Sequence, residues 1–418
     1  MLFGVDDIEN LHSFNPHGSY PNIQSDWTKL NESEARDSHH PKVEDLIQRN
    51  VKIIELYLMD IIKSRYYEEL EIGTSKDKDH CLDSKERNIL FPVEAKKELF
   101  DYVSSIARCY RSVLYHNYEH ASHVVFSSHL LIQLSRCTLK PEYCSDINTN
   151  LKIDVSSCSM ANLALVISAL VHDVDHQGVG NKQLVEEKNY LSLKYKEKSV
   201  AENNSIDIAL NLLKESRFKC LRECMFGSSD TVNPTKDAII FESLLRDMIL
   251  STDINSKECI ERNKKKWEMA FTEDVTGAQY HHISSCSVVK QSISSQISYL
   301  QLSSVLEQMI QAADVAHLMQ SWSVFLKWGR KLFHELWAAN VAGRGPSAPA
   351  NWFQCQLDFF DVYIFGLVKR LEECGIFGSC ASVFLENASN NRDRWVKEGE
   401  RICTEIYAEI SDQYDTSE

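Results

Sequence analysis

The chain has 418 residues, and its 45 Lys and Arg against 60 Asp and Glu give a formal net charge of −15. Its 43% hydrophobic and 25% charged content is that of an ordinary soluble protein with a sizeable core, which excludes disorder for most of the chain. An acidic chain without a long Lys/Arg tract lacks the concentrated positive charge of a general nucleic-acid-binding surface.

Targeting signals are absent from the sequence. The first twelve residues contain no basic region followed by an apolar stretch, so we expect no signal peptide. The longest apolar run, Met160 to Val171, is too short to span a bilayer of about 30 Å. The 13 scattered cysteines are typical of reduced thiols rather than of a disulfide scaffold. We therefore expect a cytoplasmic protein without a membrane segment in this chain.

The apolar periodicity predicts helices almost throughout. Residues 1 to about 40 show no sustained period and are interpreted as a loose N-terminal arm, and Val43 to Tyr67 is helical. Alternating strand patterns are scarce, so we expect an all-α, compact multi-helix bundle. We expect two parts, an arm with a helical lead-in over residues 1–89 and one large all-α domain over residues 90–418. The later helices are predicted at Glu94–Tyr115, His120–Arg136, Met160–His172, Val200–Arg217, Lys236–Thr252, Ile297–Ala339, Gln356–Glu373 and Arg394–Ser411.

A first candidate cluster is the histidine pair His116 and His120. These residues are four apart, so both imidazoles would project from one face if the stretch were helical. A lone histidine in such a place is more often structural. The pair is better evidence for a site than either residue alone.

A second cluster, His172-Asp173-Val174-Asp175-His176, directly follows the apolar run 160–171. Imidazoles and carboxylates crowded against an apolar wall are costly unless a cation compensates for their desolvation. If Asp173 or Asp175 capped a helix, one carboxylate would be explained, but the presence of both histidines would not. Imidazole together with carboxylate suits zinc and similar ions, so this cluster predicts a metal site.

Asp314 is a lone carboxylate in an apolar helical segment, with small alanines beside it. Unpaired aspartate is rarely buried, and small neighbours would allow the backbone to approach a site closely. An exposed aspartate is common, so the signal is weak in isolation. Beside an upstream His…His-Asp set, Asp314 becomes the expected fourth metal ligand.

The order His…His-Asp…Asp resembles the HD metal-dependent phosphohydrolase superfamily. The fuller pattern consists of Tyr-His-Asn at 115–117, the run 172–181, the later Asp314 and a Gln-x-x-Phe at 356–359. This pattern resembles the catalytic domain of class I cyclic-nucleotide phosphodiesterases, and the likeness covers about residues 90 to 410. It implies hydrolysis of 3′,5′-cyclic nucleotides, cAMP and/or cGMP, to nucleoside 5′-monophosphates in cyclic-nucleotide signalling.

The resemblance also implies the metals and the chemistry. Zinc would be bound by His120, His172, Asp173 and Asp314. Asp173 would bridge to a second ion, Mg²⁺ or Mn²⁺, which keeps most of its waters. A hydroxide that bridges the two ions would attack the phosphorus, and His116 would protonate the departing ribose oxygen as the general acid. A nearby carboxylate would keep His116 charged, but the sequence does not identify it.

Further roles follow from the same resemblance. His176 and Glu202 would orient metal-bound waters and so take part in catalysis. Gln356 would hydrogen-bond the purine, which Phe359 and Leu332 would sandwich. His116 and Asp314 would also contact the substrate. From the pattern alone, an ordinary amphipathic helix explains positions 356 and 359 equally well.

The chain departs from the family pattern in two places. Asn204 and Ser205 stand where the family usually has two histidines, and 316–318 is Ala-His-Leu in place of Ser-Asn-Pro. The alternatives are therefore an HD-type phosphohydrolase for a different nucleotide and a sensor module that binds nucleotide without turnover. The lead-in helix could also mediate contact between two copies in a homodimer.

Overall fold

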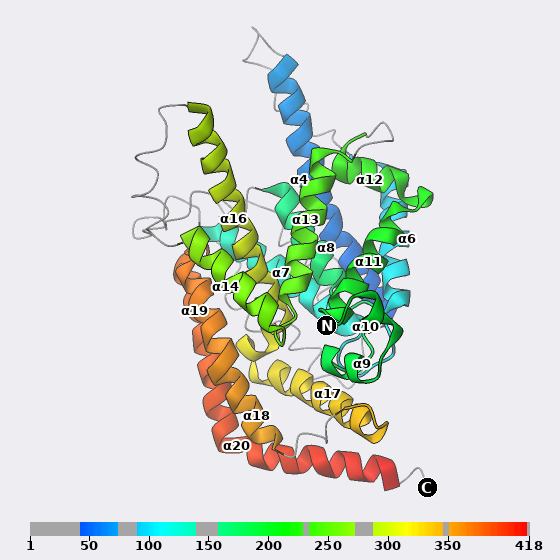
Figure 1. Cartoon of the computed structure of the whole chain (residues 1–418), viewed down its shortest axis with the longest axis vertical. Helices are drawn as coiled ribbons and strands as arrows, with labels where there is room; N and C mark the ends of the chain where they lie inside the picture. The colour runs from blue at the N-terminus through cyan, green and yellow to red at the C-terminus, as the bar shows by residue number, and fades with distance from the viewer. Residues whose placement is uncertain are drawn as a thin grey trace.

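The structure is a computed structural model that describes residues 42–73, 90–138, 158–228, 234–271, 287–345 and 351–415. Within these ranges every regular element is helical, so the all-α prediction is confirmed (Figure 1). The predicted arm at residues 1 to about 40 lies outside the described residues. The α-helices are α4 Val43–Gly73, α6 Val93–Cys109, α7 Tyr118–Thr138, α8 Ser159–Val171, α9 Asn181–Glu186, α10 Tyr190–Lys194, α11 Val200–Lys214, α12 Lys219–Phe226, α13 Lys236–Ser251, α14 Lys257–Phe271, α16 Ser287–Asp314, α17 Trp322–Val341, α18 Trp352–Phe359, α19 Phe365–Glu373 and α20 Ser382–Asp415. The 3₁₀ turns are η4 Ser216–Phe218, η5 Ala316–Met319 and η7 Gly378–Ala381, and η6 Phe360–Ile364 is a π-helical turn.

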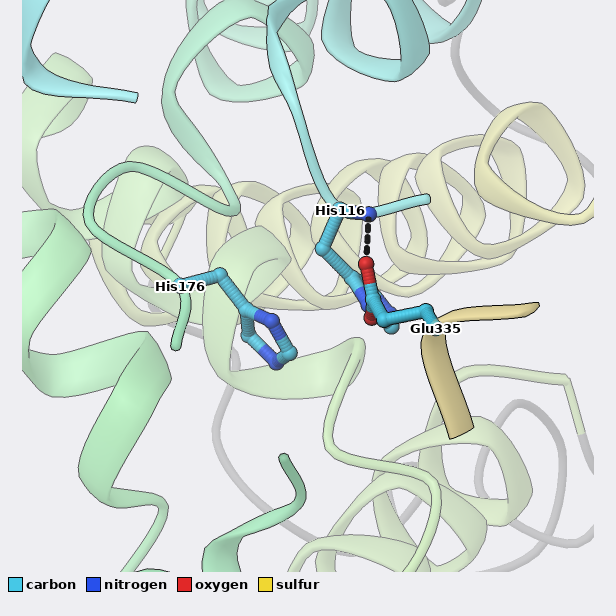
Figure 2. A group of neighbouring side chains, drawn as sticks. All are labelled: His116, His176 and Glu335. Carbon is cyan, nitrogen blue, oxygen red and sulfur yellow. Dashed lines mark hydrogen bonds and ion pairs between the residues drawn. The ribbon is translucent and has the colours of Figure 1, made fainter. Parts of the chain in front are cut away.

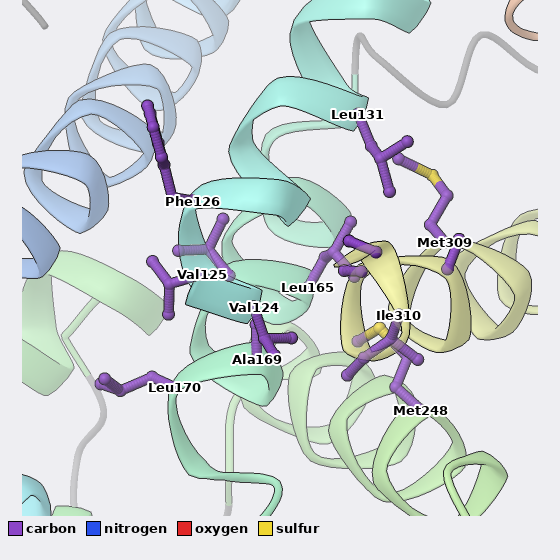
Figure 3. Packing of buried hydrophobic residues seen from close by; sticks show 14 of the residues in the cluster. Val124, Val125, Phe126, Leu131, Leu165, Ala169, Leu170, Met248, Met309 and Ile310 are labelled. Atoms are coloured by element: carbon purple, nitrogen blue, oxygen red, sulfur yellow. The ribbon is translucent and has the colours of Figure 1, made fainter. Parts of the chain in front are cut away.

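Helix α8 forms the centre of the core. Its residues 161–171 are all buried, because the helix is apolar around its whole circumference. It packs against α4, α7 and α13, while α16 covers α7 and α13. Figure 3 shows apolar side chains of α7, α8, α13 and α16 meeting there, among them Leu165 and Ile310. The metal-site residues predicted at the ends of α8 and α16 therefore stand on rigid, buried helices.

Helix α4 belongs to this same core. Ile54, Tyr57 and Leu58 are fully buried, and the Tyr57 hydroxyl lies 2.8 Å from Nδ1 of His129 on α7. The predicted lead-in is thus helical and packs as part of the bundle. The domain division at residue 90 stays a prediction.

The prediction of one continuous helix over Ile297–Ala339 is wrong. Helix α16 ends at Asp314, η5 follows, and Gln320 is extended (φ −118°, ψ −165°) before α17 begins. The segment contains no proline, and its apolar period continues across the break. A tertiary contact stabilises the break between α16 and α17. The side-chain amide of Asn391 on α20 donates to the carbonyls of Leu318 at 3.0 Å and Gln320 at 2.8 Å. It thereby satisfies carbonyls that the interrupted helix leaves without partners.

Other predicted boundaries also differ, and the helix expected over Arg394–Ser411 begins at Ser382. The helix expected over Glu94–Tyr115 ends at Cys109, and the one over Gln356–Glu373 is interrupted by η6. Helix α14, at Lys257–Phe271, was not predicted, because its lysine-rich sequence hides a narrow apolar stripe. Across the described residues, no helix combines the length and apolar character needed to cross a membrane.

Candidate metal centre and active site

Asn117 sets the geometry of the histidine pair. Its side-chain oxygen accepts hydrogen bonds from the backbone N–H groups of Glu119 at 2.9 Å and His120 at 3.1 Å, so it caps the start of α7. His120 therefore lies in the first turn of α7, and His116 lies in the bend before it. The two imidazoles do not share a helix face, yet the bend keeps their ring centroids 6.1 Å apart.

The four predicted zinc ligands come together from three helices. His120 begins α7, His172 and Asp173 follow the last residue of α8, and Asp314 ends α16. Nε2 of His120 lies 3.0 Å from Oδ1 of Asp314 and 3.7 Å from Oδ2 of Asp173. Nε2 of His172 lies 3.1 Å from Oδ2 of Asp173 and 3.5 Å from Oδ1 of Asp314. The ligand atoms of His120, His172 and Asp173 lie within 4.8 Å of one another, and Oδ1 of Asp314 contacts both imidazoles.

These residues fit a divalent metal ion. Nδ1 of His172 donates to the carbonyl oxygen of Ala169 at 3.0 Å, so Nε2 presents its lone pair to the cluster. That Nε2 atom is buried and has no hydrogen-bond partner among the described residues. Against the opposing effect of burial, a protonated His172 would hold the pKa of Asp173 well below its ordinary value, and a bound cation would take over that charge while His172 is neutral. Two buried imidazoles and two ionised carboxylates form the donor set of a zinc-type site.

Glu335 on α17 is the carboxylate partner of His116. It makes a short contact with Nδ1 of His116, and its Oε2 accepts from the backbone N–H groups of Tyr115 at 2.7 Å and His116 at 3.0 Å (Figure 2). Burial alone would lower the pKa of His116, but the negative charge of Glu335, followed by that of Asp173, raises it to about 9. Conversely, burial would raise the pKa of Glu335, and His116 lowers it to about 2. The contact with Glu335 therefore favours the charged form of the His116 ring.

His176 faces His116 from the other side (Figure 2). The ring centroids are 3.9 Å apart and the rings are tilted by 35°. Burial, followed by the positive charge of His116, lowers the pKa of His176 to about 4. One ring of this pair is thus charged and the other neutral, so the positive charge stays on His116.

Glu202 lies in the first turn of α11, within a buried acidic network. The side-chain amide of Asn181 donates to Oε2 of Glu202 at 2.9 Å and to Oδ2 of Asp253 at 3.1 Å. Burial, followed by the charge of Asp253, raises the pKa of Glu202. This arrangement gives a group that can hold a proton next to the metal-ligand cluster.

The residues predicted to bind the purine have different surroundings. Gln356 is buried and lines a small apolar cavity between α17, α18 and α20, with Trp352 and Trp395 in its wall. Phe359 stacks on Tyr363, with ring centroids 5.2 Å apart. Among the described residues, the wall of that cavity includes neither Phe359 nor Leu332. The predicted purine sandwich stays a prediction.

Sequence reasoning missed Glu335, Asn181 and Asp253. Glu335 is 219 positions from His116, and by periodicity it is one more charged residue on an amphipathic helix. Gly178 lies beside this carboxylate, since a Cβ atom there would be at an ordinary contact distance of 3.4 Å from Cγ of Glu335. The glycine itself is favoured by its φ of +71° and by Cγ1 of Val113, which would lie 3.2 Å from that Cβ.

The fold and site define the class as a helical, HD-type metal-site protein, and comparison with known proteins gives the family. The model of the 3′5′-cyclic nucleotide phosphodiesterase family matches residues 115–374. The chain belongs to this family, as the motifs of the sequence predicted.

Similar curated proteins carry cyclic-AMP phosphodiesterase names. The chain is 25% identical over 254 residues to probable 3′,5′-cyclic-AMP phosphodiesterase pde-4 of Caenorhabditis elegans, covering 60% of this chain and 32% of that protein. It is 26% identical over 254 residues to mouse 3′,5′-cyclic-AMP phosphodiesterase 4C, covering 60% of this chain and 31% of that protein. The chain thus spans about a third of the length of these relatives.

A solved structure supports the fold. The phosphodiesterase domain of the RhoPDE fusion protein from the choanoflagellate Salpingoeca rosetta matches with a TM-score of 0.58 and 17% identity. The match covers 91% of this chain and all of that one. At this identity the likeness shows the helical fold alone.

Proposed function

We propose that this chain hydrolyses 3′,5′-cyclic nucleotides to nucleoside 5′-monophosphates. The observation that carries the proposal is the imidazole of His116, which Glu335 holds beside the cluster of metal-ligand type. Both curated relatives described above are named cyclic-AMP phosphodiesterases, which supports cAMP as one substrate. Cyclic GMP is the second candidate, because the altered residues 316–318 lie where the family contacts the base.

We assign the metals to the four clustered residues. His120, His172, Asp173 and Asp314 would hold Zn²⁺, and Asp173 would also reach a second ion, Mg²⁺ or Mn²⁺. When bound, such ions lower the pKa of water and neutralise charge on a phosphate, so the acidic chain can accept an anionic substrate. His176 and Glu202 would orient the waters at this site through hydrogen bonds.

His116 performs the proton transfer in this proposal. Attack at phosphorus breaks its bond to the ribose 3′-oxygen, which is a poor leaving group until it is protonated. The imidazolium of His116 gives its proton to that oxygen, and Glu335 stabilises the charged ring before the transfer. Since Glu335 also binds two backbone N–H groups, it fixes the position of the ring as well as its charge.

The nucleotide base is assigned to Gln356, Phe359 and Leu332. Gln356 offers an amide that can both donate and accept, and Phe359 and Leu332 offer apolar faces. In the structure, Phe359 and Leu332 are both only partly buried.

The test is to measure kcat/KM for cAMP and cGMP with Mg²⁺, with and without a chelator. Metal-dependent hydrolysis of either nucleotide is the expected result. Binding without turnover would favour the sensor module, and hydrolysis of a different nucleotide alone would favour another HD-type phosphohydrolase. A homodimer and a cytoplasmic location stay predictions, and light scattering of the purified chain would measure the oligomeric state.

A further inference from the structure

Asp175 connects three segments around the candidate site. Its Oδ1 accepts a hydrogen bond from Nε of Arg111 at 2.6 Å, and its Oδ2 accepts one from the side-chain amide of Asn204 at 3.0 Å. Its backbone N–H donates to the carbonyl of Cys109 at 3.1 Å. One residue thus ties the segment after α6, the loop after α8 and helix α11 together.

The backbone at Asp175 makes a sharp turn. Its φ is +64°, in the left-handed region, which aspartate tolerates better than most residues but still at a cost. The N–H of the next residue, His176, donates back to the carbonyl of Asp173 at 3.0 Å. The turn brings the His176 ring against His116, so the contacts of Asp175 maintain a conformation on which that pairing depends.

Two residues that depart from the family pattern hold this turn. Asn204 binds the Asp175 carboxylate, and the hydroxyl of Ser205 donates to the carbonyl of Val174 at 2.9 Å. Both side chains are buried and both are neutral hydrogen-bond donors. Both residues therefore stabilise the loop, and the sensor without turnover stays an alternative for the assay described above.

We propose that Asp175, Arg111 and Asn204, here called the Asp175 junction, are positioning residues that hold the general acid His116 in register with the metal-ligand cluster. None of the three needs to contact substrate for this role. The inference rests on the proposed function, because it assigns to the junction the placement of the acid in that reaction. Misplacing a reacting group by about 1 Å can reduce a rate by up to about a hundredfold.

Asn204→Ala in the full chain is the main test. It leaves one oxygen of Asp175 without its partner while removing no charge and no metal ligand. The substrates are cAMP and its analogue with sulfur at the bridging 3′ position, whose thiolate leaves without general-acid protonation. For cAMP we expect kcat to fall about tenfold with KM nearly unchanged, and for the thio analogue we expect a much smaller loss. Bound zinc should remain at the wild-type amount.

Asn203→Ala is the matched control. Within the described part of the chain, the side-chain amide of Asn203 donates to the neighbouring carbonyls of Lys198 and Ser199, each at 3.0 Å, and to no residue of the junction, so its loss should leave both rates unchanged. Arg111→Gln is a second variant, on a side chain that is 45% exposed, so it should fold even if Asn204→Ala does not. It should show the same preference for the thio analogue, with a smaller loss because exposed ion pairs are weak.

The possible outcomes distinguish failure of the junction proposal from failure of the proposed function. Equal losses of kcat on both substrates, or loss of bound zinc, would refute the proposal that the Asp175 junction positions the general acid. If kcat is unchanged and only the melting temperature falls, the Asp175 junction contributes to stability alone, and its positioning role is refuted. A wild-type chain that hydrolyses no cyclic nucleotide would refute the proposed function itself, and the junction proposal with it.

Discussion

Glu335→Gln tests whether this carboxylate keeps His116 protonated. An imidazole ordinarily titrates near pH 6.5, and the pKa of His116 is raised to about 9. That difference corresponds to about 3 kcal/mol of stabilisation of the charged ring over the neutral ring. The charge of Asp173 also contributes, but a bound cation would offset it. Glu335 is therefore the main cause that persists in a loaded enzyme.

The substitution keeps the shape of the side chain and replaces one acceptor oxygen of the carboxylate with an NH₂ donor. Oε2 of Glu335 accepts from two backbone N–H groups, at 2.7 and 3.0 Å. If the glutamine oxygen keeps these two bonds, its NH₂ faces Nδ1 of His116, which must then accept as a neutral imidazole does. If the amide flips, it loses both backbone bonds. In either orientation the imidazolium loses its counter-charge.

The assay is the pH profile of kcat for cAMP at saturating metal. Because the acid form exists below its pKa, wild-type kcat should fall as the pH rises through about 9. In the variant this alkaline limb should move to about 6.5 or below, because burial disfavours the charged ring, and this leaves at most about a tenth of the ring charged at pH 7.5. We therefore expect kcat to be at least about tenfold lower at pH 7.5, and the deficit to shrink toward pH 5.5.

Glu409→Gln is the control for this experiment. Glu409 lies 3.8 Å from Nε2 of His334, the residue next to Glu335 on α17, so it repeats the histidine–carboxylate chemistry away from the site. Its profile should match the wild type. An alkaline limb that does not move in Glu335→Gln would refute the assignment of Glu335 as the charge partner and of His116 as the titrating acid.

The remaining predictions concern metal, acid and backbone. Asp314→Ala should abolish turnover and deplete bound zinc, measured by elemental analysis, and a normal metal content would contradict its role as a ligand. His116→Ala should reduce kcat by at least about a hundredfold with zinc retained, and parallel metal loss would reassign it as a ligand. Gly178→Ala should lower the free energy of unfolding by more than about 1 kcal/mol in urea, since φ is +71° and a Cβ would lie 3.2 Å from a valine methyl. Gly180→Ala, where a Cβ has open space, should be nearly neutral, and equal losses at both positions would refute the steric argument.

The ligand cluster was predictable because its chemistry is local. His172 and Asp173 follow an apolar helix directly, and ionisable groups in that place have few explanations other than a cation. Asp314 was predictable only through the other ligands, since a single aspartate near a helix end carries little information. The helix-face argument for His116 and His120 did not hold, because Asn117 caps α7 between them.

The partners of these residues were not predictable, because they depend on tertiary contacts. Asn181 reaches Glu202 across 21 positions and Asp253 across 72, and Asn204 reaches Asp175 across 29. By composition, each of these asparagines is equally suited to a cap or a turn. Only the packing of α11 against α9 and α13 selects the buried hydrogen bonds.

The break after α16 decides whether the acid can meet the metal-ligand cluster. A continuous helix from Asp314 to Glu335 would separate the two residues by about 31 Å, at about 1.5 Å per residue. In the structure, Glu335 contacts His116, whose ring is 6.1 Å from that of His120, and His120 lies 3.0 Å from Asp314. The chain must therefore turn back between the two carboxylates, and Asn391 stabilises that turn by binding its carbonyls. An apolar period that runs unbroken from α16 into α17 thus hides the feature that assembles the site.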